Sequence, residues 1–383
     1  MDVAFLGTGS GYPSPCRSAS CMAIRHEGEV WLIDCGEGSQ TQIMKTKLIR
    51  PGRITKIFIT HLHGDHLFGL PGLLCTISMA YKSSNEEAME VEKEDIDPTD
   101  TIVEIYGPCG LRRFLRESLN LSRSILSFKY VVHELVPENK QYNHIKGGDP
   151  DWSKWSPDHM ATGSLHINEC KHGRAIFYDS SCEGWFIFKD EKITILAGQL
   201  CHRIPAFGYV FFEPPKPGRL ESEKLQKAGV PKGPLYGKIK RGESVTLADG
   251  TVINPRDYIG PEQPGRKVAI LQDTRDSWST LSICQNCDVM IHEATNENSH
   301  YKQCYDNGHS TPAMAAEFAT AANASTLVLT HFSQRYKDPH LHEEIDDTDL
   351  TVDKLVEEAG EGFLGNVIAA YDGLILPVTR KVK

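Results

Sequence analysis

Residues 58–74 have the sequence FITHLHGDHLFGLPGLL, in which three histidines and one aspartate lie within six positions, directly after an apolar run. Because side chains alternate along a strand, two histidines that are two positions apart point the same way if the strand ends near Thr60. Gly64 lets the chain turn, so that the aspartate and the third histidine face the same space. The four side chains of this cluster are His61, His63, Asp65 and His66.

Imidazole and carboxylate groups are the ligands that zinc prefers in proteins, and a catalytic zinc takes about three ligands from the protein. Four such groups exceed that requirement and indicate two metal ions. The alternative is a solvated loop with incidental histidines, which would not explain the glycine or the apolar continuation at 67–74. Ligand type alone does not separate zinc from manganese or iron.

Further candidate ligands follow other apolar runs. Taken singly, a His or Asp at a strand end is typical of a cap or of a hydrogen-bonded core group. Taken together they indicate one shared crevice, because the loops past the carboxyl ends of strands in an α/β sheet meet there. The candidates are His202 in HRIPAFGY, Asp273 after VAILQ, His292 and Glu293 after VMI, and His331 after LVLT.

Ten short apolar runs, bounded by Gly, Pro or Asp, predict buried strands between VAFLGTG at 3–9 and VIAAYDGLILPV at 367–378. Helical patterns lie at 111–121 and 313–324, the second with Thr311 as its predicted N-cap and Pro312 at its first position. This alternation predicts the α/β class, with helices packed on sheet faces.

The 383 residues carry a net charge of −10, which argues against a general nucleic-acid coat protein and is ordinary for a soluble enzyme. No apolar stretch approaches the ~20 residues that cross a bilayer, so we expect a soluble intracellular protein without membrane contact. The eleven cysteines are odd in number and scattered, which predicts reduced thiols. A zinc or redox role for the lone C-x-x-C at 284–287 is the less favoured alternative.

Three stretches have the composition of insertions. Residues 82–100 hold eight acidic and two basic side chains and predict a mobile acidic segment. Residues 138–180 are polar and have no assigned role. Residues 213–241 hold eight Lys or Arg against three Glu, among Gly and Pro, and predict a basic projection on an acidic protein.

These motifs carry a family resemblance. HLHGDH after a strand, LIDCGEG, the strand-end Asp273 and the late THFS resemble the metallo-β-lactamase superfamily. Within it, HRIPAFGY, IHEAT, GHSTP and LTHFSQRY resemble the short form of the zinc-dependent endoribonuclease tRNase Z, from residue 3 to about 378. The resemblance implies a single domain over 1–383, an αββα sandwich of two mixed sheets with helices outside, and a protruding basic exosite at about 213–255.

The resemblance also implies two zinc ions per subunit and their ligands. His61, His63 and His202 would hold one ion; Asp65, His66 and His331 would hold the other; Asp273 would bridge the two. The sequence departs from the family pattern at one position: the family usually has Gly before the bridging aspartate, and this chain has Gln272. The direction in which the Asp273 side chain points is therefore left open. Asp34 in LIDCGEG would steady the histidine loop, with a plain strand-end cap as the alternative.

Three residues are predicted to act on protons. By the resemblance and by its place beside the metal-bound water, Asp65 accepts the water's proton. His309 in GHSTP is the candidate that protonates the leaving ribose oxygen. His309 precedes a helix N-terminus, which attracts phosphate but disfavours an imidazolium. A protonated His309 therefore needs a carboxylate neighbour, and Glu293 is the candidate.

The predicted function is removal of the 3′ trailer from precursor tRNA, leaving a 3′-hydroxyl for CCA addition. The resemblance further implies a homodimer and a location in the cytoplasm, with the nucleus left open. The alternatives are a small-ester or thioester hydrolase on the same fold and a non-catalytic RNA-binding relative. The predicted substrate-binding residues are Lys232, Lys238, Lys240, Arg241, Ser310, Thr311 and Arg335.

Overall fold

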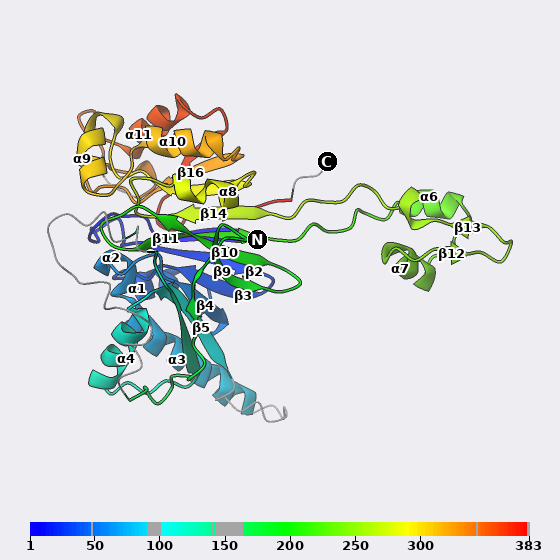
Figure 1. Ribbon diagram of the computed structural model, residues 1–383, viewed down its shortest axis with the longest axis horizontal. Helices are drawn as coiled ribbons and strands as arrows, with labels where there is room; N and C mark the ends of the chain where they lie inside the picture. Colours follow the sequence, from blue (N-terminus) through cyan, green and yellow to red (C-terminus); the bar gives the residue numbers. More distant parts are fainter. Residues whose placement is uncertain (47–48, 90–100, 139–140, 142–163, 342–343, 381–383) are drawn as a thin grey trace. The chain divides into compact units, whose positions relative to one another are not determined.

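The computed structural model describes residues 1–383 apart from 47–48, 90–100, 139–140, 142–163, 342–343 and 381–383 (Figure 1). The chain forms two compact units. The first comprises Met1–Lys189, Ile195–Phe211 and Lys267–Val378, and the second comprises Asp190–Thr194, Phe212–Arg266 and Thr379–Lys383. The prediction had placed one domain over 1–383 with a projection at 213–255; that projection lies within the second unit.

The first unit contains two mixed eight-stranded sheets. In the first sheet β1 pairs antiparallel with β18 and β2, and β3 to β7 run parallel to one another. Its order is β18 (Ile375–Pro377), β1 (Asp2–Gly7), β2 (Cys21–His26), β3 (Glu29–Ile33), β4 (Ile54–Phe58), β5 (Ile102–Pro108), β6 (Lys129–Leu135) and β7 (Ala175–Ile176).

The second sheet has parallel pairs from β14 to β17 and an antiparallel pair between β8 and β9. Its order is β17 (Asn366–Ala369), β16 (Thr326–Thr330), β15 (Val289–Glu293), β14 (Lys267–Leu271), β11 (Ala206–Phe212), β10 (Thr194–Leu200), β9 (Gly184–Lys189) and β8 (Tyr178–Asp179).

Aromatic rings fill the layer between the sheets. Phe58 of β4 stacks on Tyr106 of β5 at 5.2 Å and contacts Tyr209 and Phe211 of β11, each at 5.3 Å between ring centroids. Buried rings of this size dominate core energetics, so the two sheets are fixed face to face.

Helices cover the outer faces of both sheets (Figure 1). Those on the first sheet bury a leucine-rich cluster that includes Leu73, Leu74 and Leu115 against strand residues such as Ile57 and Ile105. The fold is therefore the predicted αββα arrangement. Its helices are α1 (Ser39–Lys45), α2 (Gly64–Leu67), α3 (Leu70–Met89) and α4 (Leu111–Leu121) on one side, and α8 (Leu281–Cys284), α9 (Tyr301–Asp306), α10 (Pro312–Ala321) and α11 (Val352–Gly360) on the other.

The second unit has a small core of its own. It contains α6 (Ser222–Lys227), α7 (Pro234–Lys240), and a hairpin of β12 (Val245–Thr246) and β13 (Val252–Ile253). The apolar cluster is made of Leu225, Val230, Ile239, Val245 and Ile253. Two chain segments lead to it and are bonded to each other, since Lys216 and Gln263 exchange two backbone hydrogen bonds.

The predicted elements are largely present. Each of the ten apolar runs contains or overlaps a strand, and the helix predicted at 111–121 is α4. The predicted start of α10 is confirmed, with Thr311 at the N-cap in an extended conformation and Pro312 as the first helical residue; the Thr311 side chain makes no capping hydrogen bond. All eleven cysteines are free, as expected, and Cys284 and Cys287 are buried.

The acidic and polar insertions are partly ordered structure. Residues 82–89, predicted to be a mobile segment, continue the backbone of α3, and 90–100 lie outside the described residues. In the 138–180 insertion, β7 extends the first sheet and β8 the second. Nearby, Arg116 of α4 donates two hydrogen bonds to Glu169, each at 2.8 Å, so this stretch is anchored to the core. Trp152 and Trp155 lie outside the described residues.

Candidate metal centre

Parallel pairing in the second sheet brings its site residues to one edge. Leu271 of β14 pairs with His292 of β15, and Glu293 pairs with Thr330 of β16. Asp273, Glu293 and His331 therefore lie at or just past neighbouring carboxyl ends, where an α/β sheet places its crevice. The loop after β4 of the first sheet carries the histidine cluster, which lies at the same edge.

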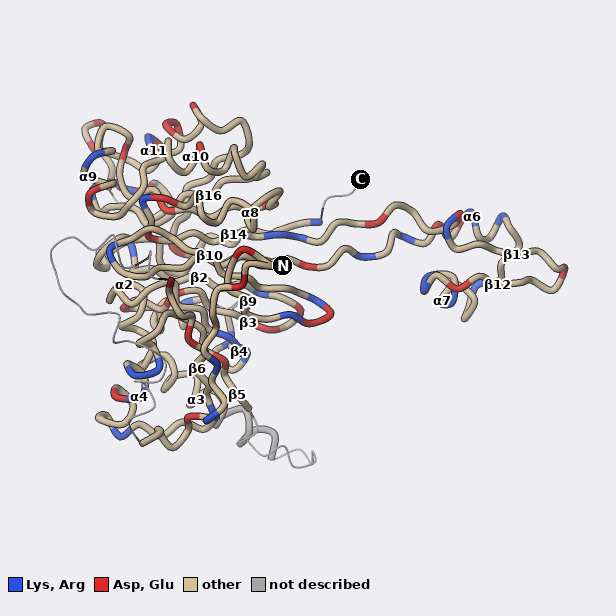
Figure 2. Tube along the Cα trace, viewed as in Figure 1, with Lys and Arg blue, Asp and Glu red and all other residues tan. Residues whose placement is uncertain are grey.

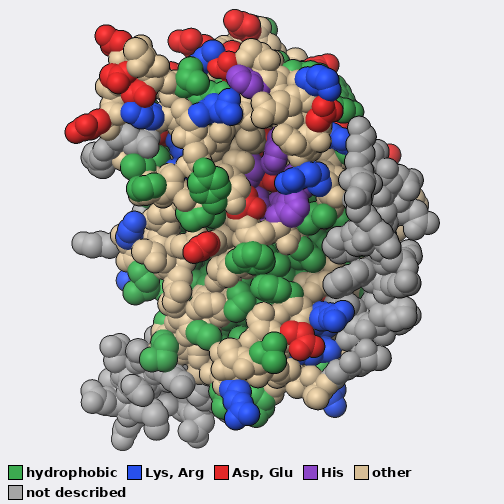
Figure 3. Space-filling view, turned by 90° about the vertical axis from the view of Figure 1, so that its left-hand side faces the viewer, with side chains coloured by type: hydrophobic (Ala, Val, Ile, Leu, Met, Phe, Trp, Pro, Cys, Tyr) green, Lys and Arg blue, Asp and Glu red, His purple; other side chains and the backbone are tan. Residues whose placement is uncertain are grey.

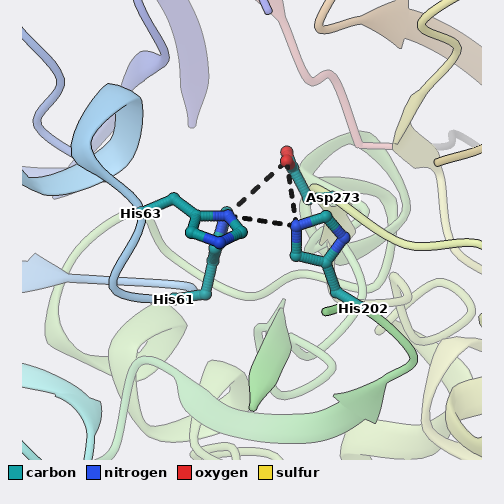
Figure 4. A group of neighbouring side chains, drawn as sticks. All are labelled: His61, His63, His202 and Asp273. Atoms are coloured by element: carbon teal, nitrogen blue, oxygen red, sulfur yellow. Dashed lines mark hydrogen bonds and ion pairs between the residues drawn. The ribbon is translucent and has the colours of Figure 1, made fainter. Parts of the chain in front are cut away.

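A first group consists of three imidazoles and one carboxylate oxygen, all within 4.8 Å of one another. His63 Nδ1 lies 3.0 Å from His61 Nε2 and 3.1 Å from His202 Nε2. Asp273 Oδ2 lies 3.7 Å from His61 Nε2 and 3.6 Å from His202 Nε2. Figure 4 shows the three rings and the carboxylate converging on one point.

A second group shares Asp273 with the first. Asp273 Oδ1 lies 3.1 Å from His66 Nε2 and 3.0 Å from His331 Nε2. Asp65 Oδ2 lies 3.5 Å from each of the same two nitrogens. The two carboxylate oxygens of Asp273 thus face different groups, as expected for a bridging ligand.

Hydrogen bonds to the far side of each ring determine which nitrogen faces the groups. The Nδ1–H of His66 donates to Asp34 at 2.7 Å, and that of His202 donates to the Gly308 carbonyl at 2.6 Å. His61 Nδ1 lies 3.1 Å from the Thr60 hydroxyl, and His331 Nδ1 lies 3.2 Å from the Thr295 hydroxyl. All four rings therefore present a bare Nε2 to the groups, and such outer partners are typical of metal-ligating histidines.

The protonation of these side chains fits a metal. Burial lowers the pKa of His63 to about 4 and that of His202 to about 3, so both are neutral near pH 7 and have a lone pair to offer. Asp273 Oδ1 is buried and accepts no hydrogen bond from the described residues. Bare nitrogens facing one another at 3.0–3.3 Å beside an unsatisfied carboxylate oxygen need a cation between them.

The raised pKa of His66 also indicates that a cation is favoured in the second group. Burial alone would lower its pKa, but Asp273, Asp34 and Asp65 outweigh burial and raise it well above the usual range. Positive charge is thus favoured at this position, and a metal ion would supply it in place of the proton.

Asp34 combines both roles that its sequence position allowed. Besides accepting from His66, its Oδ1 accepts the Thr60 backbone N–H at 2.7 Å. Asp34 and His331 have φ values of 59° and 60°, a left-handed conformation that is uncommon outside glycine. Such backbone strain gathers at functional sites, where the surrounding structure imposes it.

Gln272 does not move Asp273 out of position. Its side chain is buried, and among the described residues its Oε1 accepts no hydrogen bond. Asp273 still reaches both groups. The departure from the family pattern is therefore accommodated within the core.

His309 and Glu293 form the predicted pair. His309 Nδ1–H donates to Glu293 Oε1 at 3.0 Å, and Glu293 also accepts from the Thr274 N–H at 2.8 Å and the Thr295 hydroxyl at 2.7 Å. Burial alone would lower the pKa of His309, but the Glu293 carboxylate outweighs it and raises the pKa to about 9. His309 therefore carries a proton at neutral pH. His292, another strand-end candidate, belongs to neither metal group and lies 2.7 Å from the Ser277 hydroxyl.

The predicted substrate-binding residues differ in solvent exposure. The side chains of Ser310 and Thr311 are each 1% exposed, and Ser310 Oγ donates to the Thr274 carbonyl at 2.6 Å. Ser310 thus links the loop that carries His309 to the loop that carries Asp273, and a substrate-binding role for Ser310 and Thr311 stays a prediction. Arg335 is exposed, and its Nη1 lies 3.2 Å from His300 Nε2. The others, Lys232, Lys238, Lys240 and Arg241, are exposed in the second unit.

The two groups open into a hollow of about 350 Å³ that contains residues missed by the sequence analysis. The Gly11 N–H donates to Asp65 Oδ2 at 2.8 Å and orients that carboxylate. Tyr12, Phe68 and Arg203 also line the hollow. Arg203 stands directly after His202, so the HRIP motif contained the signal, whereas nothing in the sequence places Gly11 near Asp65. Figure 3 shows histidine side chains inside this face, beside hydrophobic and basic ones.

The comparisons with known proteins agree with this fold and site. Residues 14–148 match the family model described as the metallo-beta-lactamase superfamily. The chain is 47% identical to zinc phosphodiesterase ELAC protein 1 of Homo sapiens over 347 residues, which is 88% of this chain and 87% of that protein. It is 38% identical to ribonuclease Z of Streptococcus suis over 88% of this chain and 90% of that protein.

Among solved structures, human tRNase Z, short form, superposes with a TM-score of 0.63 at 35% identity, covering 99% of this chain and all of that one. The chain is therefore a member of the metallo-β-lactamase superfamily. Within that superfamily it belongs to the ribonuclease Z family, as the 47% identity over most of both chains shows.

Proposed function

We propose that this chain is a zinc-dependent endoribonuclease that removes the 3′ trailer from precursor tRNA. The observation that carries the proposal is Asp273, whose two oxygens face two separate groups of histidines with bare Nε2 atoms. The names of its relatives, zinc phosphodiesterase and ribonuclease Z, support both the metal and the substrate class.

The residues fit two zinc ions. His61, His63, His202 and Asp273 would hold one, and Asp65, His66, His331 and Asp273 the other. When bound, such a pair supplies a water acidified towards neutral pH and neutralises charge on a phosphodiester.

The protein side chains handle the protons. Asp65 accepts the proton of the attacking water, and the Gly11 N–H at 2.8 Å orients the carboxylate for this role. Burial opposes ionisation of Asp65, but the positive charge favoured at His66 outweighs burial and lowers the pKa of Asp65, so Asp65 is ionised.

His309 acts at the opposite end of the reaction. Because Nδ1 is bonded to Glu293, Nε2 is the nitrogen that can face the substrate. As the P–O3′ bond breaks, His309 donates its proton to the departing oxygen. The products are an RNA with a free 3′-hydroxyl, ready for CCA addition, and a trailer with a 5′-phosphate.

We further propose that the second unit binds the tRNA away from the cleavage point. Its segment Phe212–Arg266 has ten Lys or Arg and seven Asp or Glu, which is a net charge of +3, while the whole chain has a net charge of −10. In Figure 2 the Lys and Arg positions of this unit, coloured blue along the chain trace, lie on α6 and α7 and on the two connecting segments. Spaced cations suit a duplex stem, which is recognised through its shape and phosphates. A homodimer and a cytoplasmic location remain predictions; no described helix is long and apolar enough to cross a membrane.

The test is cleavage of one 3′-extended precursor tRNA by the zinc-loaded protein, with the cut ends mapped, beside an Asp65→Ala variant. The wild type should make a single break next to the discriminator base, and the variant almost none. Scattered cleavage, or undiminished cleavage by the variant, would contradict the mechanism. Hydrolysis of small esters or thioesters with the precursor left intact would favour the alternative enzyme class.

A further inference from the structure

A second hollow, of about 190 Å³, is lined by residues of the same two loops that carry Asp273 and His309. The two loops are bonded to each other, since Ser310 Oγ donates to the Thr274 carbonyl at 2.6 Å. Asp273 lines the first hollow and Arg275 the second, and two residues of chain span at most about 7 Å. His309 and Ser310 divide between the hollows in the same way. The second hollow is thus a near neighbour of the reacting groups.

Aromatic rings dominate the accessible wall of this hollow. Trp278 is 46% exposed, Tyr301 52% and Tyr305 41%. The two tyrosine rings stack on each other with centroids 5.9 Å apart and an angle of 22°. Single exposed aromatic residues are ordinary, but three around one hollow mark a surface for a flat apolar ligand.

A cation lies among these rings. The guanidinium carbon of Arg275 is 5.0 Å from the centre of the Tyr305 ring, and its Nε–H donates to Cys201 Sγ at 3.3 Å. Within the described parts of the chain no carboxylate forms a salt bridge with Arg275, so its terminal N–H groups are open to a ligand. Aromatic rings beside an open arginine are the combination that binds an unpaired nucleotide, through stacking and contacts to phosphate or base.

We propose that this hollow binds the unpaired base of the nucleotide whose 3′-oxygen departs, the last nucleotide of the tRNA product. The inference rests on the proposed function. In an in-line displacement the leaving oxygen lies opposite the attacking water, so this nucleotide extends from the phosphorus towards His309 and away from Asp65. The second hollow is lined by Ser310, the residue directly after His309, and is therefore within reach of this nucleotide. Stacking accepts any base, which suits a position that differs among tRNAs.

Two carboxylates also line the hollow, and they define the competing occupant. Asp276 Oδ1 accepts the Trp278 backbone N–H at 2.9 Å, and Glu317 is exposed. Aromatic rings with carboxylates can bind an organic cation such as a polyamine. Charge alone does not favour the nucleotide, because one arginine stands against two carboxylates in this lining. The stacked tyrosine rings and the Arg275 guanidinium beside Tyr305 favour it, since they can hold a flat base and its phosphate.

The experiment pairs a protein change with a substrate change. Precursor tRNA and the same RNA with an abasic last nucleotide before the cut are cleaved by the wild type and by a Tyr301→Ala/Tyr305→Ala variant. Phe177→Ala, which removes a 62%-exposed ring elsewhere, is the control. The variant should raise KM for the intact precursor by about tenfold, as expected for one lost stacking interaction. With the abasic RNA, the variant and the wild type should have the same KM, because no base is left to stack.

The outcomes are distinct. Equal losses on both RNAs, or no loss on the intact one, would overturn the proposal. So would inhibition by spermidine that disappears in the variant while the abasic change has no effect, which would assign the hollow to a cation. Thermal unfolding and zinc content of each variant exclude misfolding as the cause. If the wild type cleaves neither RNA, the proposed function fails first and this inference with it.

Discussion

The metal centre and the basic second unit differ in how their polar side chains are held. At the metal centre four of the five histidine rings contact a partner on their far side: these partners are Asp34, Thr60, Gly308 and Thr295. In the second unit most basic side chains are exposed around a five-residue apolar cluster, and Arg241 forms a salt bridge with the exposed Glu243.

This difference predicts that substitutions in the two regions change different measured quantities. Burial gives the metal centre short distances and low dielectric, which charge stabilisation in a reaction needs. Exposure leaves the second unit with weak, salt-screened contacts, which suit long-range attraction of a polyanion. Changes at the centre should therefore alter zinc content and kcat, and changes in the second unit should alter KM and its salt dependence.

The largest effect is expected for Asp273→Ala, which breaks the centre at its shared ligand. Both groups lose an oxygen, so zinc content should fall below the about two ions per chain expected for the wild type, and kcat/KM for precursor tRNA should fall by about 10⁴-fold or more. Metal analysis and cleavage kinetics check this. Asp347→Ala, at an exposed carboxylate in the same unit, should change neither. Full zinc content in the Asp273 variant would show that the carboxylate is no ligand.

His309→Ala should come next. Loss of a positioned acid lowers kcat for precursor tRNA by about 10²- to 10⁴-fold, with zinc content unchanged. The loss should be much smaller for bis(p-nitrophenyl) phosphate, because nitrophenolate leaves without being protonated. An equal loss on both substrates would assign His309 a structural role. Glu293→Gln should show the same pattern more weakly, since it removes the charge that raises the pKa of His309 to about 9.

Asp34→Asn should have a moderate effect that zinc can reverse. Asparagine tolerates the left-handed conformation at φ 59°, so the backbone is preserved while the charge that faces His66 is lost. Zinc affinity should fall by about 10- to 100-fold, and added zinc should restore kcat. Competition with a chelator measures the affinity, and a defect that excess zinc leaves untouched would argue against an orienting role.

The convergence of the candidate metal ligands could be predicted from the sequence because each of them follows a strand end. HLHGDH, His202, Asp273 and His331 each adjoin an apolar run, and parallel pairing brings such ends to one edge. The Glu293–His309 pair was also predicted, because a protonated histidine beside a helix N-terminus needs a carboxylate neighbour.

Other features depended on tertiary contacts that no local pattern records. Strand β2 and strand β6 were not among the predicted runs, although both lie inside the first sheet. Gly11 meets Asp65 across 54 positions of sequence. The burial of Ser310 and Thr311, both predicted as substrate-binding residues, likewise depends on how their loop packs. Composition marked the basic segment, yet not the small core that makes it a separate unit.

The smallest effect is expected for Lys238→Gln/Lys240→Gln in α7, and it sharpens the comparison most directly. Both lysines are exposed, so the change should leave folding and zinc content intact. If they contact phosphates, KM for precursor tRNA should rise several-fold, and the slope of log KM against log salt should decrease by about one per lost contact. Lys171→Gln/Lys189→Gln, a matched pair of exposed lysines in the first unit, should change neither quantity. Equal effects of the two pairs would mean that net charge alone, and not the second unit, attracts the RNA.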